Sequence, residues 1–99
     1  MPTNVIEYKQ IFASAAQNAP ATLKADFEDF STKMVNVYKC NQDLDGMPLN
    51  LDGQGAVQAF TLAPAFAVFS KKAEATREGM IFFKQVREKV KAFHLNKNS

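Results

Sequence analysis

The sequence is poor in cysteine, proline and glycine, and it has no tryptophan. The single cysteine, Cys40, excludes an internal disulfide and fits a reducing compartment, so we expect a cytoplasmic protein. Four glycines and four prolines among 99 residues argue against a disordered chain. Hydrophobic residues make up 46% of the sequence and include nine phenylalanines. We therefore predict one domain over residues 1–99 with a compact core that needs no metal, disulfide or other cofactor.

A long, strongly hydrophobic run is also missing. The longest stretch without charge, residues 53–70, contains glycine, glutamine and proline, and most of its apolar residues are alanine. This composition favours a buried segment over a membrane span. No basic region precedes an apolar run at the N-terminus, so we expect no signal peptide.

Apolar residues in the first 40 positions recur at alternating steps of three and four. This spacing predicts helices over residues 4–17 and 21–40, packed as an antiparallel hairpin over residues 4–40. Pro20 separates them, because proline disfavours helix at the residue before it. The first stripe is Val5, Tyr8, Phe12, Ala15 and Ala19, and the second is Leu23, Phe27, Phe30, Met34 and Val37.

Turn-forming residues dominate the centre of the chain and predict a loop over residues 41–55. Two Asp-Gly pairs are turn signals, and Pro48 blocks helix. The sequence is compatible with either of two conformations at the end of this loop. Residues 49–51 pair with 56–60 in a short β-hairpin, or a short helix runs from about residue 55 to 63.

The C-terminal region, residues 56–94, predicts one long helix or two helices in series, with Pro64 either kinking the helix or starting it. Residues 79–94 carry an apolar stripe that is rotated by roughly 100° from the stripe upstream of it. Because the two stripes point in different directions, the helix must pack on different neighbours along its length, or it must bend or break. We expect this change near Gly79, because glycine is the weakest helix former there. The fold class predicted is all-α, a three- to four-helix bundle with a long C-terminal helix.

Residue types that perform catalysis are scarce and scattered. Cys40 and the single histidine, His94, have no spacing that brings them together, so we expect no enzyme and no catalytic residues. His94 falls in the last turn of the predicted helix, where an imidazolium would stabilise the helix dipole. The loop partly matches a calcium-binding loop, but Pro48 and the short Asp at its last position disagree, so we predict no metal site. The loop residues concerned are Asn41, Asp43, Asp45 and Asp52.

Charge is divided unevenly along the chain. Residues 1–70 carry four lysines against seven acidic residues, whereas residues 71–99 carry eight basic residues against three glutamates. Lys84, Arg87 and Lys91 form a basic face on the last helix. Our preferred interpretation is that this face is the solvated side of a core helix. The alternatives are that it binds the phosphates of nucleic acid, rests on an acidic membrane surface or enters a partner's groove.

The aromatic content of the C-terminal region exceeds what a short helical hairpin covers. We therefore predict a non-catalytic protein-association module, a homodimer or a complex with another helical protein. The second hypothesis is a cavity lined by Phe and Met that binds a small apolar molecule, and the third is weak nucleic-acid binding through the basic helix. The predicted interface or pocket residues are Phe66, Phe69, Met80, Phe82, Phe83, Val86, Val90 and Phe93.

Overall fold

A computed structural model of the chain describes residues 3–40 and 60–97. The elements are α1 (Thr3–Ala16), the 3-10 turn η1 (Ala21–Leu23), α2 (Lys24–Cys40), α4 (Pro64–Ala73) and α5 (Arg77–Lys97). The predicted all-α bundle with a long C-terminal helix is confirmed, and no strand occurs in the described ranges. The predicted loop 41–55 and all of the hairpin region 49–60 except Phe60 lie outside these ranges.

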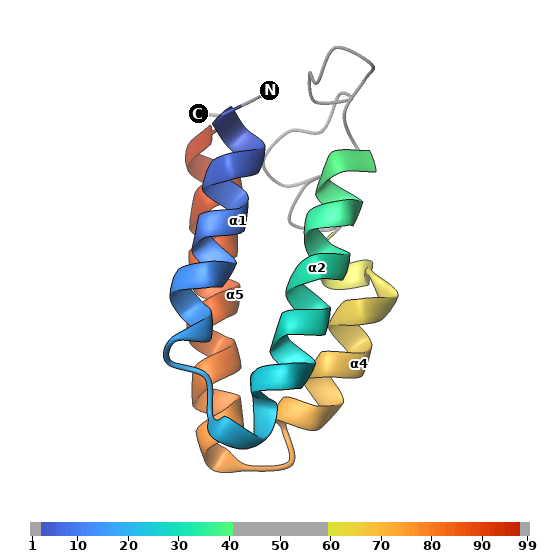
Figure 1. Ribbon diagram of the computed structural model, residues 1–99, viewed down its shortest axis with the longest axis vertical. Helices are drawn as coiled ribbons and strands as arrows, with labels where there is room; N and C mark the ends of the chain where they lie inside the picture. The colour runs from blue at the N-terminus through green and yellow to red at the C-terminus, as the bar shows by residue number, and fades with distance from the viewer. Residues whose placement is uncertain (1–2, 41–59, 98–99) are drawn as a thin grey trace.

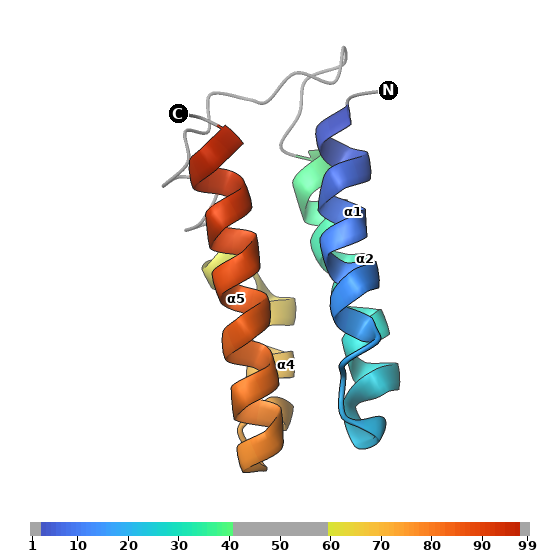
Figure 2. The ribbon, with the colours of Figure 1, turned by 90° about the vertical axis from the view of Figure 1, so that its left-hand side faces the viewer.

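The four long helices form an up-down bundle of two layers. Each contacts its neighbours in the cyclic order α1, α2, α4, α5, and consecutive helices run in opposite directions (Figure 1). Figure 2 shows one layer made by α1 and α2 and the other by α4 and α5. The molecule is elongated along the helices, with extents of 39 × 22 × 21 Å.

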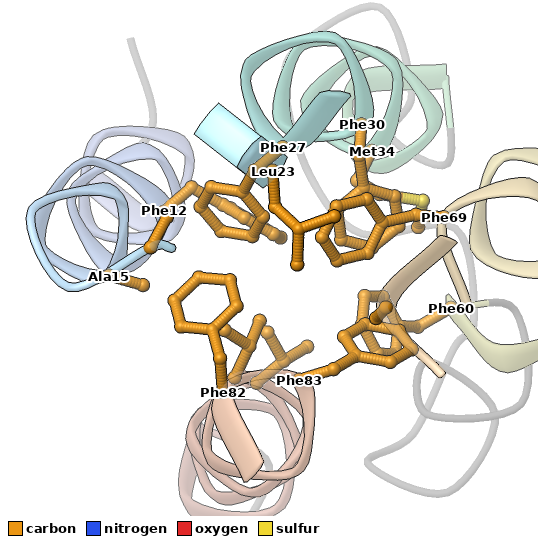
Figure 3. Packing of buried hydrophobic residues seen from close by; sticks show 14 of the residues in the cluster. Phe12, Ala15, Leu23, Phe27, Phe30, Met34, Phe60, Phe69, Phe82 and Phe83 are labelled. Carbon is orange, nitrogen blue, oxygen red and sulfur yellow. The ribbon is translucent and has the colours of Figure 1, made fainter. Parts of the chain in front are cut away.

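Aromatic side chains fill the space between the layers. Figure 3 shows Phe12 of α1, Phe27 and Phe30 of α2, Phe69 of α4, and the two adjacent phenylalanines of α5 pointing into one core. The Phe30 ring stacks on Phe69 at 5.0 Å, and the Phe27 ring meets Phe82 edge-on at the same distance. Offset and edge-on pairs are the arrangements that aromatic quadrupoles favour. The rings of α4 and α5 are therefore covered by α2 and α1 of the same chain.

The C-terminal helical region breaks before Gly79 rather than at it. Helix α4 starts at Pro64, as one of the two predicted roles for that proline requires, and ends at Ala73; α5 starts at Arg77. Thr76 caps α5, because its Oγ1 accepts a hydrogen bond of 3.0 Å from the Gly79 N–H. The chain turns over residues 74–76, and this turn lets the rotated apolar stripes of α4 and α5 both face the core.

Gly79 has a packing role at this turn. A Cβ built on it would lie well inside van der Waals distance of the Ala73 carbonyl oxygen, which belongs to the backbone and cannot swing aside. Alanine is the better helix former by about 1 kcal/mol, so propensity alone predicts that Gly79→Ala stabilises the protein. We expect the opposite, a loss of about 1 kcal/mol in the free energy of unfolding, because overpacking outweighs propensity here. Urea denaturation followed by circular dichroism measures the sign, and the reverse change Ala92→Gly on exposed α5 surface calibrates the propensity effect.

Candidate functional site

Most of the predicted interface residues lie inside the chain's own core. Met80 is 48% exposed, and Phe66 and Phe93 are half-buried. The other five, which a partner cannot reach while the bundle is folded, are Phe69, Phe82, Phe83, Val86 and Val90. The premise that the helical hairpin is too small to cover the C-terminal rings is wrong, because α1 and α2, the two helices of that hairpin, form a layer on which α4 and α5 pack.

The exposed large hydrophobic side chains are dispersed over the bundle. Leu62, which lies just before α4, is 81% exposed. The others among the described residues are Ile6 on α1, Val68 on α4, and Met80 and Ile81 on α5. Single exposed apolar residues are ordinary on protein surfaces, so none of them marks a site alone.

An open groove of about 560 Å³ runs along the outer seam between α1 and α2. Its α1 wall is formed by Lys9, Ala13 and Ala16, and its floor includes Phe12. Its α2 wall includes Glu28, Thr32 and Val35. This seam belongs to the layer nearer the viewer in Figure 1, and no residue of α4 or α5 lines it.

Small side chains and satisfied hydroxyls make the groove accessible to another helix. Ser31 Oγ donates to the Phe27 carbonyl at 2.7 Å, and Thr32 Oγ1 donates to the Glu28 carbonyl at 3.1 Å. Both hydroxyls already donate to carbonyl groups of their own helix. A partner that covers them therefore does not leave these donors without a hydrogen bond. With alanines opposite them, another backbone can approach the seam closely.

Sequence reasoning missed the groove. The only signal for it is a pair of alanines, Ala13 and Ala16, one helical turn apart on the edge of the apolar stripe that contains Phe12. Alanines at such positions are common on ordinary helices, and the predicted hairpin does not say which flank of α1 faces which flank of α2. The groove therefore becomes visible only when the structure fixes how α1 and α2 are rotated against each other.

The predicted basic face is exposed on α5, as expected for a solvated surface. Lys84, Arg87 and Lys91 all lie at the surface, and the Arg87 guanidinium carbon stands 5.2 Å from the centre of the Phe83 ring. Charges are also balanced within the fold, since Lys72 Nζ lies 2.7 Å from Asp26 Oδ1 across the α2–α4 seam. This ion pair is half exposed, so it adds little to stability.

A cluster of polar aromatic side chains lies at the end of the bundle where α1 begins and α5 ends, and its members Tyr8 and His94 are buried. Tyr8 stacks on Tyr38 with ring centroids 4.5 Å apart, and the His94 ring lies 5.4 Å from Tyr8. Burial lowers the pKa of His94 to about 4, so the side chain is neutral near pH 7 and the predicted imidazolium is wrong. Burial, with Tyr38 nearby, raises the pKa of the Tyr8 hydroxyl. Both groups are thus held in their neutral forms, which suits a structural role in the core.

Metal binding finds no support in the part of the chain that the structure describes. No group of three or more His, Cys, Asp or Glu side chains there is arranged to hold an ion. The calcium-loop residues Asn41, Asp43, Asp45 and Asp52 lie outside the described ranges. Among the helices described, none is both long and apolar enough to cross a membrane.

Comparison with known proteins adds no family to this description. No protein-family model, curated protein or solved structure matches the chain.

Proposed function

We propose that the chain is a non-catalytic helical association module that self-associates through the groove between α1 and α2. The observation that carries this proposal is the groove itself, an open hollow of about 560 Å³ with small side chains on both walls. Helical partners dock into grooves of this kind by laying one face along the seam. The single cysteine fits a reducing compartment such as the cytoplasm, where we place the protein.

The groove favours a partner helix over a small apolar ligand. Ligand sites are concave and bury most of the ligand surface, whereas this groove is open to solvent along the seam. The cavities at two other helix seams measure only about 20 and 10 Å³, each room for about one water molecule. Among the described residues, phenylalanine rings fill much of the space between the two helical layers, which supports association over ligand binding.

Native mass across a dilution series tests the proposal. We expect light scattering to give twice the 11.0 kDa chain mass at high concentration and a fall toward one chain on dilution. Ala13→Glu places a bulky charge on the groove wall, and we expect it to shift the mass to that of the monomer while the helical circular dichroism is kept. Ala92→Glu, at an exposed position of α5, is the matched control and should leave the dimer intact.

Two results would contradict self-association through the groove. One is a mass of a single chain at every concentration up to the millimolar range. The other is a dimer that Ala13→Glu and Ala92→Glu affect equally, since the contact would then lie elsewhere.

A further inference from the structure

We propose that two copies meet groove to groove about a two-fold axis, with the helices of one copy antiparallel to their counterparts and Lys9 of each copy facing Glu28 of the other. This arrangement rests on the proposed self-association and specifies its register. The occupant of the groove is therefore a second copy of the same surface. Charge complementarity along the seam is what selects it.

The two charges lie at opposite ends of the groove. Tyr8 stacks on Tyr38, which places the adjacent Lys9 toward the C-terminal half of α2. The groove is lined by residues 9–16 of α1 and 28–36 of α2, and these helices run antiparallel, so Glu28 lies at the end of the groove near Ala16 and away from Lys9. Lys9 and Ala16 mark the two ends of the α1 wall, and at 1.5 Å per helical residue the separation along the seam is about 10 Å. The groove is thus basic at one end and acidic at the other.

Neither Lys9 nor Glu28 forms an ion pair with another described residue. The ion pairs among the described residues join Lys33 to Asp29 and Lys72 to Asp26, and neither involves Lys9 or Glu28. Both side chains are exposed beside the groove, where a second chain can reach them.

A two-fold axis through the middle of the groove exchanges its two ends. It brings Lys9 of one copy against Glu28 of the other, and symmetry repeats the contact, so two ion pairs form. A parallel arrangement would instead place Lys9 against Lys9 and Glu28 against Glu28. Between the pairs lie Ala13 and Thr32, whose small side chains permit close contact of the two seams. Exposed pairs contribute little affinity, so their role is to set the register.

Charge reversal distinguishes this register from any other contact. We expect Lys9→Glu and Glu28→Lys each to raise the dimer dissociation constant at least about tenfold, because each variant places two like-charge contacts in the dimer. The double variant K9E/E28K should recover wild-type dimerisation. An equimolar mixture of the two single variants should form a heterodimer, since both ion pairs are restored across the mixed interface.

Further measurements separate a lost contact from a lost fold. Circular dichroism reports folding of each variant, and Glu28→Gln removes the charge with less disturbance if Glu28→Lys does not fold. Lys84→Glu, a charge reversal on α5 outside the groove, is the matched control and should leave dimerisation unchanged. Added salt should weaken the wild-type dimer, since exposed charge pairs are screened.

The results that overturn the register differ from those that overturn self-association. If the wild type dimerises and Ala13→Glu disrupts it, but K9E/E28K stays monomeric, then the antiparallel pairing is wrong and the association module stands. If the wild type is monomeric throughout, both proposals fail. Recovery in the double variant supports the two-fold, because a partner of different sequence would not gain from reversing both charges.

Discussion

Replacing Phe30 with alanine is expected to lower the free energy of unfolding by about 3–5 kcal/mol, the largest effect of any single truncation in this core. Phe30 is 2% exposed and lies where side chains from α1, α2, α4 and α5 meet. Its ring is 5.0–6.1 Å, between centroids, from the rings of Phe12, Phe27, Phe60, Phe69 and Phe83. Truncation removes contacts on several sides at once, and all four helices would have to move to close the cavity.

Urea unfolding at fixed pH measures this loss. Ile81→Ala is the control, because Ile81 is 52% exposed and its truncation should cost less than about 1 kcal/mol. A loss below 1 kcal/mol for Phe30→Ala would contradict the packing described here. It would mean that the rings of α4 and α5 do not close on α2 in solution.

Acid should destabilise the protein through His94 before the carboxylates begin to protonate. The side chain is 3% exposed, and burial lowers its pKa to about 4 from an ordinary value of 6.5. In this interval the unfolded chain binds a proton that the folded chain does not, so stability is complete above about pH 6.5 and falls as the pH drops toward 4. Linkage between these pKa values gives a loss of about 2 kcal/mol between pH 7.5 and pH 5.

The sequence makes this effect simple to isolate, because His94 is the only histidine. Urea unfolding at several pH values measures the slope, and His94→Gln supplies a chain without the titrating group. We expect the variant to be less stable than wild type at neutral pH but nearly independent of pH between 7.5 and 5. A wild-type profile that is equally flat would show that His94 is solvated in the folded state.

The period of the apolar residues was sufficient to predict the helices. The steps of three and four from Val5 to Ala15 and from Leu23 to Met34 mark faces that are buried in the bundle. Pro20 and Pro64 also act as local chemistry requires, one between helices and the other at a helix start. These features depend on neighbours within one or two turns, so they can be read without knowledge of the fold.

Partner identity could not be read in the same way. The stripe of α5 was correctly predicted to be apolar, but the sequence does not say whether α1 and α2 of the same chain or a second chain cover it. The groove depends on which flank of α1 stands beside which flank of α2, and the neutrality of His94 depends on rings from three helices around it. Each of these properties is set by residues far apart in sequence.

By itself, the sequence determined that this is an all-α protein with amphipathic helices and a phenylalanine-rich core, because side-chain period and turn chemistry act locally. Only the tertiary structure decided that those rings are covered within one chain and that an open seam remains between α1 and α2. The physical reason is that burial is a property of the space between helices, and that space is defined only after all four have packed.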